Sequence, residues 1–447
     1  MAHRRTKGKI VQRVFLAVFL VLSLASAQEE VPYGLEPGQP YAGTQLGFLI
    51  CCPTATQFAA LTERTADFTE LTGIEVTWDT GPYAAYQEKL VVEAVSGTGT
   101  YDAVAWVDSW GESIKPYLVP LNERIEASGM DMSDFPEAYV EAASGEEGKI
   151  YGIPFRGHAM TLFYRTDVFE ELGLEPPTTW QEVVEVGQTI KAETDLEPIS
   201  MYYGVNAGQN LFLWLSHLWG NGGDIFDENY RPIFNNEAGA EATEAYVGLL
   251  REHELTQPSA VTFFEQDANL EAVQGRAAMF VGWSWMYDQF TNPEAISPEA
   301  EGNIGYAPAP AWEGGTPVTY AQIWPVGIMS ASSKQDAAWE FIKWLTHPEV
   351  EKEVALDKSN PETSNIVAVH LSNLRDPEVN ATTGGLQNVM ADVLETARTQ
   401  PLIAEWAEVQ SILEIAINEM AGGAPVQETL DRAAGEVEAV MERGGYY

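Results

Sequence analysis

The sequence predicts an α/β protein of two lobes, each a mainly parallel sheet flanked by helices, with a ligand cleft between the lobes. Three observations favour this fold class. The chain has 447 residues, 45% of them hydrophobic, which is enough for two cores of about 200 residues each. Short apolar segments alternate with segments of helical periodicity, as in parallel sheets. Gly- and Pro-rich connections separate two such regions, as expected of a hinge.

Residues 1–27 have the pattern of a Sec-type signal peptide. Basic residues precede an apolar segment at 14–24, and Ala25-Ser26-Ala27 supplies small residues at a cleavage site. The apolar segment is shorter than the ~20 residues of a membrane-spanning helix, and no cysteine lies at the cleavage point. The sequence therefore indicates an exported, periplasmic protein, with a flexible leader rich in Pro, Gly and Glu at 28–43.

The first lobe is predicted from alternating strand and helix patterns. Strands are expected at 46–50, 74–78 and 103–106, and helices at 58–71 and 83–95. In parallel sheets, ligands bind beyond the carboxyl ends of the strands. The candidate site residues at these strand ends are Cys51, Cys52, Trp78 and Asp108.

A second α/β region begins near His158. Residues 162–164 are typical of a strand, and Thr179 is suited to cap a helix over 180–191. Gly- and Pro-rich sequence between 302 and 317 predicts a crossover between the lobes. Further helices are expected at 210–219, 238–251, 335–345 and 405–420.

The charge of the chain excludes one class of partner. There are 24 basic and 66 acidic residues, which gives a formal net charge of −42. Such a field repels phosphate backbones, so we expect no nucleic-acid partner.

The two cysteines, Cys51 and Cys52, are adjacent. Neighbouring Cα atoms lie ~3.8 Å apart, below the ~4.4–6.8 Å of ordinary disulfides. A bridge between them would be strained, and strained features gather at functional sites. Two free, partly buried thiols are the alternative.

The sequence has none of the common catalytic motifs. It contains no G-x-S-x-G elbow, H-E-x-x-H pair, Walker loop or paired C-x-x-C. Its six histidines are scattered without the spacing of metal ligands. We therefore expect no catalytic residues, no metal and no cofactor.

Aromatic residues are the more informative feature. A flat aromatic face stacks on the C–H face of a sugar ring, while neighbouring polar groups bind its hydroxyls. Among the 13 tryptophans, Trp283 and Trp285 follow the apolar segment 277–281, where a strand should end. Both are candidate sugar-stacking residues, although core packing is the alternative for any single tryptophan.

Four more residues are candidate ligand contacts. Arg156 and His158 follow the strand that leads into the first crossover, where charge-assisted hydrogen bonds could hold hydroxyl groups. An ion pair between Arg156 and an acid of the other lobe is the alternative. Gln322 and Trp324 lie in the segment 320–325, before the chain re-enters the first lobe.

A series of short motifs follows in order along the chain. They are 72–76 (TGIEV), 101–104 (YDAV), 117–121 (YLVPL), 149–154 (KIYGIP), 162–167 (LFYRTD), 175–180 (EPPTTW), 275–279 (GRAAM) and 338–345 (AWEFIKWL). With the signal peptide, this series resembles the sugar-binding family of bacterial extracellular solute-binding proteins, the maltose-binding-protein-like receptors of ABC importers. The resemblance extends from about residue 44 to 438.

The resemblance implies a periplasmic-binding-protein fold whose lobes close on a sugar, each lobe being made of discontinuous segments. The first lobe would comprise 41–155 plus 303–350, and the second 156–302 plus 351–447. The family's second-lobe stacking position matches Trp283, with Trp285 close by.

Other family positions fall on both lobes. The strand and loop that supply a tryptophan and an acid in maltose receptors match Trp106 and Asp108. Asn210 and Phe212 begin a helix that faces the cleft in relatives, and Trp406 falls near a further stacking position. Maltose receptors carry a carboxylate where this chain has His158, which argues against maltose as the ligand.

We therefore expect the substrate-binding subunit of an ABC-type carbohydrate importer, a monomer and not an enzyme. It would capture a mono- or oligosaccharide or a polyol and deliver it to membrane permease subunits. One alternative is a ferric-ion receptor of similar fold, for which the adjacent Tyr202 and Tyr203 would supply phenolate ligands. The other is a secreted glycoside hydrolase with a pair of carboxylates.

Overall fold

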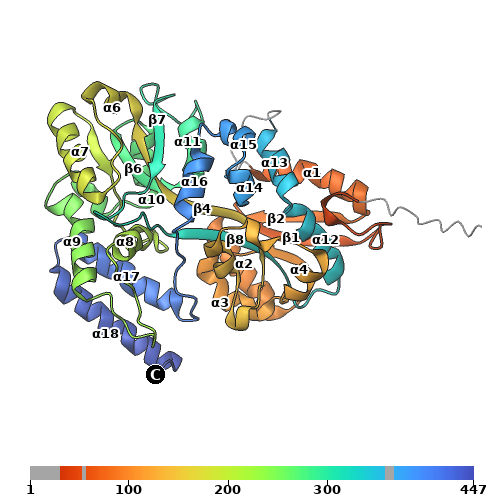
Figure 1. Ribbon diagram of the computed structural model, residues 1–447. Helices are drawn as coiled ribbons and strands as arrows, with labels where there is room; N and C mark the ends of the chain where they lie inside the picture. The colour runs from red at the N-terminus through yellow and green to blue at the C-terminus, as the bar shows by residue number, and fades with distance from the viewer. Residues whose placement is uncertain (1–30, 53–56, 358–366) are drawn as a thin grey trace, which may run out of the picture.

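The computed structural model describes residues 31–52, 57–357 and 367–447, which form two lobes joined by one sheet (Figure 1). The strands lie in the order β2-β1-β3-β8-β4-β6-β5, and β7 pairs with β4. The strands are β1 Gln45–Cys51, β2 Glu75–Gly81, β3 Ala103–Ala105, β4 Ile153–Arg165, β5 Glu197–Ser200, β6 Ala277–Trp283, β7 Ile304–Pro308 and β8 Ala321–Ile328.

Strand β4 belongs to both lobes. Its residues 153–159 pair with β8, and residues 160–165 pair with β6 and β7. Strands β1, β2 and β3 run parallel, as do β5 and β6, whereas β4, β7 and β8 run antiparallel to their partners. The connection between the lobes therefore runs through the sheet itself.

Helices surround a separate hydrophobic core in each lobe. Those of the first lobe are α1 Gln57–Thr72, α2 Tyr83–Ser96, α3 Gly111–Ile114, α4 Asn122–Ser128, α5 Glu137–Ala143, α12 Gln335–Leu345, α13 Pro348–Leu356, α14 Leu371–Leu374, α15 Pro377–Thr382 and α16 Leu386–Leu394. Those of the second are α6 Thr166–Leu172, α7 Trp180–Glu193, α8 Gln209–Gly220, α9 Glu237–Arg251, α10 Glu265–Val273, α11 Tyr287–Thr291, α17 Trp406–Ala421 and α18 Val426–Gly444.

Two segments pack in a different lobe from the one that the sequence predicts. Residues 367–394, expected in the second lobe, place Leu374, Leu386 and Met390 in the core of the first. Residues 303–308, expected in the first lobe, include β7, which pairs with the second-lobe half of β4. In both cases the segment follows a crossover between the lobes, and it packs against the lobe that buries its apolar side chains.

The start of the described chain is also held more firmly than predicted. Residues 32–36 belong to the expected flexible leader, yet Leu35 is buried in the first core. The Lys343 ammonium on α12 donates to Gly34 O at 2.6 Å, and Glu340 accepts from Glu36 N at 2.8 Å. An apolar side chain and two hydrogen bonds therefore fix this segment to α12.

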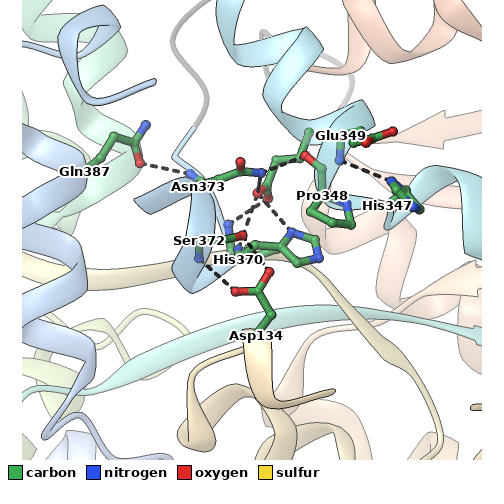
Figure 2. A network of polar contacts seen from close by, with 11 residues as sticks. Asp134, His347, Pro348, Glu349, His370, Ser372, Asn373 and Gln387 are labelled. Atoms are coloured by element: carbon green, nitrogen blue, oxygen red, sulfur yellow. Dashed lines mark hydrogen bonds and ion pairs between the residues drawn. The ribbon is translucent and has the colours of Figure 1, made fainter. Parts of the chain in front are cut away.

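A polar network fastens α14 to the first lobe (Figure 2). Glu351 on α13 accepts hydrogen bonds from Val369 N at 2.7 Å and Asn373 Nδ2 at 2.8 Å, and pairs with His370 Nδ1 at 3.0 Å. Nearby, Asp134 accepts from the backbone and hydroxyl of Ser372. The chain that follows the undescribed residues 358–366 is thereby fixed to α13.

Among the described residues, none of the helices combines the length and the hydrophobicity that crossing a membrane requires. The predicted signal peptide lies outside the described residues.

Candidate functional site

One face of the β4–β8 pair carries four of the predicted site residues. Arg156 lies opposite Trp324, and His158 lies opposite Gln322 in the antiparallel register. Because side chains alternate along a strand, these four residues share one face, while Phe155 lies on the other and joins the first core. The structure therefore brings these predicted residues together.

Aromatic rings line this face on the first-lobe side. The ring of Trp110 has its centroid 4.9 Å from that of Tyr83 and 5.8 Å from that of Trp324. The Arg156 guanidinium lies 4.8 Å from the centroid of Trp324, a cation–π contact. Trp106 is buried in the same core cluster as Trp324. The first lobe thus contributes a cluster of aromatic rings, and the Arg156 guanidinium packs on one of them, Trp324.

The second lobe contributes a matching aromatic cluster. Trp283 ends β6 and is 1% exposed, and its indole N–H donates to Gln209 Oε1 at 3.1 Å. Its ring centroid lies 5.7 Å from that of Phe212 and 5.8 Å from that of Tyr320, both edge-on. Phe212 and Tyr320 stack on each other at 4.4 Å. The orientation of Trp283 is therefore fixed by two rings and a hydrogen bond.

A hydrogen bond joins the two lobes at the site. Tyr320, part of the second core, donates its hydroxyl proton to Asp108 Oδ2 at 2.5 Å, across to the loop after β3. Burial raises the pKa of Asp108 to about 7, although the Tyr320 hydrogen bond acts to lower it. The Tyr320 oxygen also lies 3.1 Å from Gln400 Oε1. The lobes are therefore in contact at Asp108.

Several buried polar atoms around this contact have no hydrogen-bond partner among the described residues. Such groups are costly unless something supplies the missing bond. Both ring nitrogens of His158 are among them, and burial, with the charge of Arg156, holds the pKa of His158 well below its usual value, so the ring is neutral. Asp108 Oδ1 and the indole nitrogens of Trp106 and Trp324 are also among them.

Replacing Tyr320 with phenylalanine is expected to raise the pKa of Asp108 above about 7 and to weaken the contact between the lobes. A hydrogen bond to a charged group contributes about 1.5–3 kcal/mol, and this one stabilises the carboxylate. The pH dependence of ligand binding in Tyr320→Phe should shift to higher pH. Tyr203→Phe is the control, because its hydroxyl donates to Tyr246 O within the second lobe. Identical pH profiles for wild type and Tyr320→Phe would contradict the assignment.

One predicted site residue lies elsewhere. Trp78 on β2 packs edge-on against Phe48 and Phe341, with ring centroids 4.9 Å and 6.0 Å away. Its indole N–H donates to Thr65 Oγ1 on α1 at 3.1 Å. Trp78 therefore belongs to the core on the α1 and α12 side of the sheet, and the opposite face carries Trp324.

Other predicted residues pack around the residues of the site. The buried amide of Asn210 donates to Tyr203 O and Glu414 O, which ties α8 to α17. Phe212 backs Tyr320 and Trp283, as described above. Trp406, buried in the first turn of α17, and the half-buried Trp285 pack on the second core. Helix α17 also contacts the turn at 108–110 in the first lobe.

Cys51 and Cys52 form a disulfide at the carboxyl end of β1. Cys51 is buried in the cluster that contains Trp106 and Trp324, and Cys52 is half-buried at its edge. Cys52 has a φ of 65°, in the left-handed region. The bridged alternative of the sequence prediction is thus the one observed.

Sequence reasoning missed several residues of the site. Tyr83 begins α2, so no strand-end pattern pointed to it, and Trp110 ends the turn at 108–110 that follows β3. Tyr320 and Gln400 come together from distant segments, at an isolated bridge between Tyr320 and Arg398.

The tyrosine pair proposed for iron is unsuited to it. Tyr203 donates its hydroxyl to Tyr246 O at 2.9 Å, and burial raises the pKa of both Tyr202 and Tyr203. Phenolate ligands require the opposite shift. No cluster of three or more His, Cys, Asp or Glu residues suited to a metal ion occurs among the residues that the structure describes.

A cavity of about 390 Å³ opens elsewhere, at the start of α12 on the first lobe, beside Arg124, Ser332 and Lys334. The buried carboxylate next to it, Asp102, accepts from Ser332 Oγ at 2.6 Å and from Lys334 Nζ at 3.0 Å. These polar groups already have partners, so the region between the lobes is the better candidate site.

The family model described as bacterial extracellular solute-binding protein matches residues 53–352. The chain belongs to this family. The family resemblance predicted from the motifs is thereby confirmed. A probable amino-acid ABC transporter periplasmic-binding protein of Sinorhizobium fredii is 26% identical over 420 residues, covering 91% of each chain.

Solved structures of the family confirm the two-lobed α/β fold. The sugar-binding protein MalE of Xanthomonas citri has a TM-score of 0.78 at 21% identity, covering 90% of this chain and 98% of that one. A solute-binding protein of Agrobacterium radiobacter K84 solved with ribitol has a TM-score of 0.74 at 25% identity, covering 90% of this chain and 100% of that one.

Proposed function

We propose that this solute-binding protein is the receptor subunit of an ABC-type carbohydrate importer, exported to the periplasm by its signal peptide. It captures a mono- or oligosaccharide or a polyol between its lobes and delivers it to membrane permease subunits. It acts as a monomer without catalysis of its own.

The observation that carries this proposal is the aromatic-lined contact between the lobes, where buried polar atoms have no hydrogen-bond partner among the described residues. Trp283 and Trp324 lie buried at this contact, and their apolar faces would stack on the C–H face of a sugar ring that enters between the lobes. Both ring nitrogens of His158 and Oδ1 of Asp108, which lack a hydrogen-bond partner within the described parts of the chain, would bind hydroxyl groups of the ligand. A small molecule with hydroxyl groups around a carbon skeleton meets both needs at once.

The relatives support a small polar ligand but differ in its class. The Agrobacterium radiobacter protein was solved with ribitol, a polyol. The name of the Sinorhizobium fredii relative gives an amino acid, so amino acids are the second candidate class. The cation of Arg156 favours this class, because it could pair with a ligand carboxylate.

Isothermal titration calorimetry against mono- and disaccharides, polyols and α-amino acids is the test. We expect binding to at least one carbohydrate or polyol. Binding of amino acids alone would contradict the carbohydrate assignment, and hydrolysis of chromogenic glycosides would contradict the absence of catalysis.

Ligand binding is expected to make the molecule more compact. A ligand that touches residues of both lobes stabilises the closed form over the open one. Small-angle scattering should therefore show a smaller radius of gyration with a bound sugar than without it. Equal radii would mean that lobe closure is not coupled to this ligand.

A further inference from the structure

The disulfide between Cys51 and Cys52 adds little to the stability of the fold as a cross-link. A disulfide stabilises a protein mainly by closing a loop in the unfolded chain, and this effect grows with the length of the loop. The two residues are neighbours and are the only cysteines of the sequence, so their bridge encloses no other residue. Its effect is therefore local, at the carboxyl end of β1.

The bridge keeps two neighbouring side chains on one face of the sheet. Along a strand, successive side chains point to opposite faces. Cys51 and Leu49, two residues apart on β1, accordingly lie in the same core cluster. By this alternation Cys52 would lie on the other face, but its φ of 65° turns the chain, and its side chain packs at the edge of that same cluster. The cluster also contains Trp106 and Trp324.

Ring contacts connect this end of β1 to the candidate site. The hydroxyl of Tyr86 lies 3.3 Å from Leu49 O and also contacts Ala105 O, so one buried ring joins the ends of β1 and β3. The same ring has its centroid 6.2 Å from that of Trp324. Trp324 in turn lies opposite Arg156 on the site face of β4 and β8. A displacement at the bridge would therefore reach the site through packed rings.

A reductant can reach the bridge from one side. Cys51 is fully buried, whereas Cys52 is half-buried, so a thiolate meets the Cys52 sulfur first. Its attack forms a mixed disulfide with Cys52 and releases the Cys51 sulfur, which takes up a proton. The second thiol of a dithiol reductant then bonds to the first and releases the Cys52 sulfur, which also takes up a proton. Two electrons and two protons thus pass to the protein, and the reductant leaves as a disulfide.

Reduction has to move at least one of the two sulfur atoms, because atoms that are not bonded pack farther apart than bonded ones. Cys51 is enclosed in a close-packed core, so the residue that moves is Cys52 at its edge. Without the bridge, no covalent link keeps Cys52 in the left-handed region, which residues other than glycine seldom adopt. The Cys52 N–H, which donates to Gly81 O at 2.9 Å beyond the end of the β1–β2 ladder, is then released.

We propose that the Cys51–Cys52 disulfide is a redox-controlled positioning element of the ligand site. The oxidised form holds the end of β1 against the cluster of Trp106 and Trp324 and so keeps the first-lobe side of the site in shape. Reduction by a dithiol loosens this end of the lobe and weakens ligand binding without unfolding the protein. This inference rests on the proposed function, because it concerns the regulation of the same site.

The first part of the test needs no ligand and treats the folded protein with dithiothreitol. Mass spectrometry after alkylation should find two thiols. Amide hydrogen exchange should become faster at the end of β1 and in the turn at 108–110, and should stay unchanged in β5 and β6 of the second lobe. The melting temperature should fall by no more than about 4 °C, since the bridge closes no loop.

The second part measures binding of ribitol, glucose and maltose by calorimetry before and after reduction. A probe that binds the oxidised protein should bind the reduced protein about tenfold or more weakly, because the site is no longer preorganised. The control is the double variant Cys51→Ser/Cys52→Ser, which cannot form the bridge. It should match the reduced protein in exchange and affinity and should not respond to dithiothreitol.

The outcomes separate this role from the proposed function. A bridge that dithiothreitol does not reduce in the folded protein, unchanged hydrogen exchange after reduction, or equal binding of a probe to both forms would each overturn the redox-controlled element. A much larger fall in melting temperature would also overturn it, because the bridge would then be a structural cross-link. If no carbohydrate or polyol binds the oxidised protein, the proposed function falls. Faster exchange on reduction would still support the redox-controlled element, and unchanged exchange would overturn it too.

Discussion

Replacing Trp283 with alanine is expected to weaken ligand binding by about 30-fold or more, since a buried aromatic anchor commonly contributes at least about 2 kcal/mol. Its ring is the central member of the second-lobe cluster, edge-on to both Phe212 and Tyr320. The substitution would remove the stacking face that we propose for the ligand. It also removes one of the two rings that pack against Tyr320, whose hydroxyl binds Asp108 of the other lobe, and leaves only Phe212.

Two further variants test whether the loss of ligand affinity is specific to the Trp283 ring. Trp283→Phe keeps a ring but loses the hydrogen bond to Gln209, so we expect an intermediate affinity. Trp78→Phe changes a tryptophan in the core of the first lobe, away from the site, and should leave affinity unchanged. Circular dichroism and thermal melting would verify that each variant is folded. A folded Trp283→Ala with wild-type affinity would remove Trp283 from the site.

Local patterns predicted the helices and strands well where the chain repeats an apolar face. The helix expected at 335–345 is α12, Gln335–Leu345, and the one expected at 180–191 is α7, Trp180–Glu193. Thr179 caps α7 in a full capping box with Glu182. These features depend on neighbours in the sequence, so the sequence alone contains the information.

The packing of segments that are far apart in the sequence was harder to predict. No local signal shows that residues 367–394 fold back onto the first lobe, because the contacts that hold them, such as Glu351 with His370, join separate helices. Within the site, Arg156 and Trp324 were predicted from separate segments, and only the antiparallel register of β4 and β8 shows that they lie opposite each other. Trp78 was misplaced because a strand-end position does not tell which face of the sheet a side chain occupies.

Replacing Glu351 with glutamine is expected to lower the free energy of unfolding by about 3–5 kcal/mol, the usual cost of breaking a buried ion pair. Glu351 receives donors from Val369 and Asn373 and pairs with His370, all at 3.0 Å or less. Glutamine cannot accept all of these bonds, and its amide carries no charge to pair with the buried His370.

The pair of Glu351 and His370 is expected to stabilise the fold only within a limited range of pH. Burial alone would lower the pKa of His370, but the charge and hydrogen bond of Glu351, with the charge of Asp134, raise it above its usual 6.5. Its contribution is therefore complete below pH 6.5 and is lost as the pH rises through the higher folded pKa. Burial would raise the pKa of Glu351, but His370 and the donors lower it below 4.5.

The contribution of Glu351 is consequently complete above pH 4.5 and is lost as the pH falls through its lower folded pKa. Urea unfolding of wild type and Glu351→Gln from pH 3 to 9 should show the largest difference between about pH 4.5 and 6.5. Glu353→Gln is the matched control: it lies on the same helix, and its partner Arg64, at 2.7 Å, is partly exposed. That surface pair should contribute less than about 1 kcal/mol. Because the Glu351 pair holds α14 to α13, a difference that does not vary with pH would mean that packing, and not charge, fastens the returning chain to the first lobe.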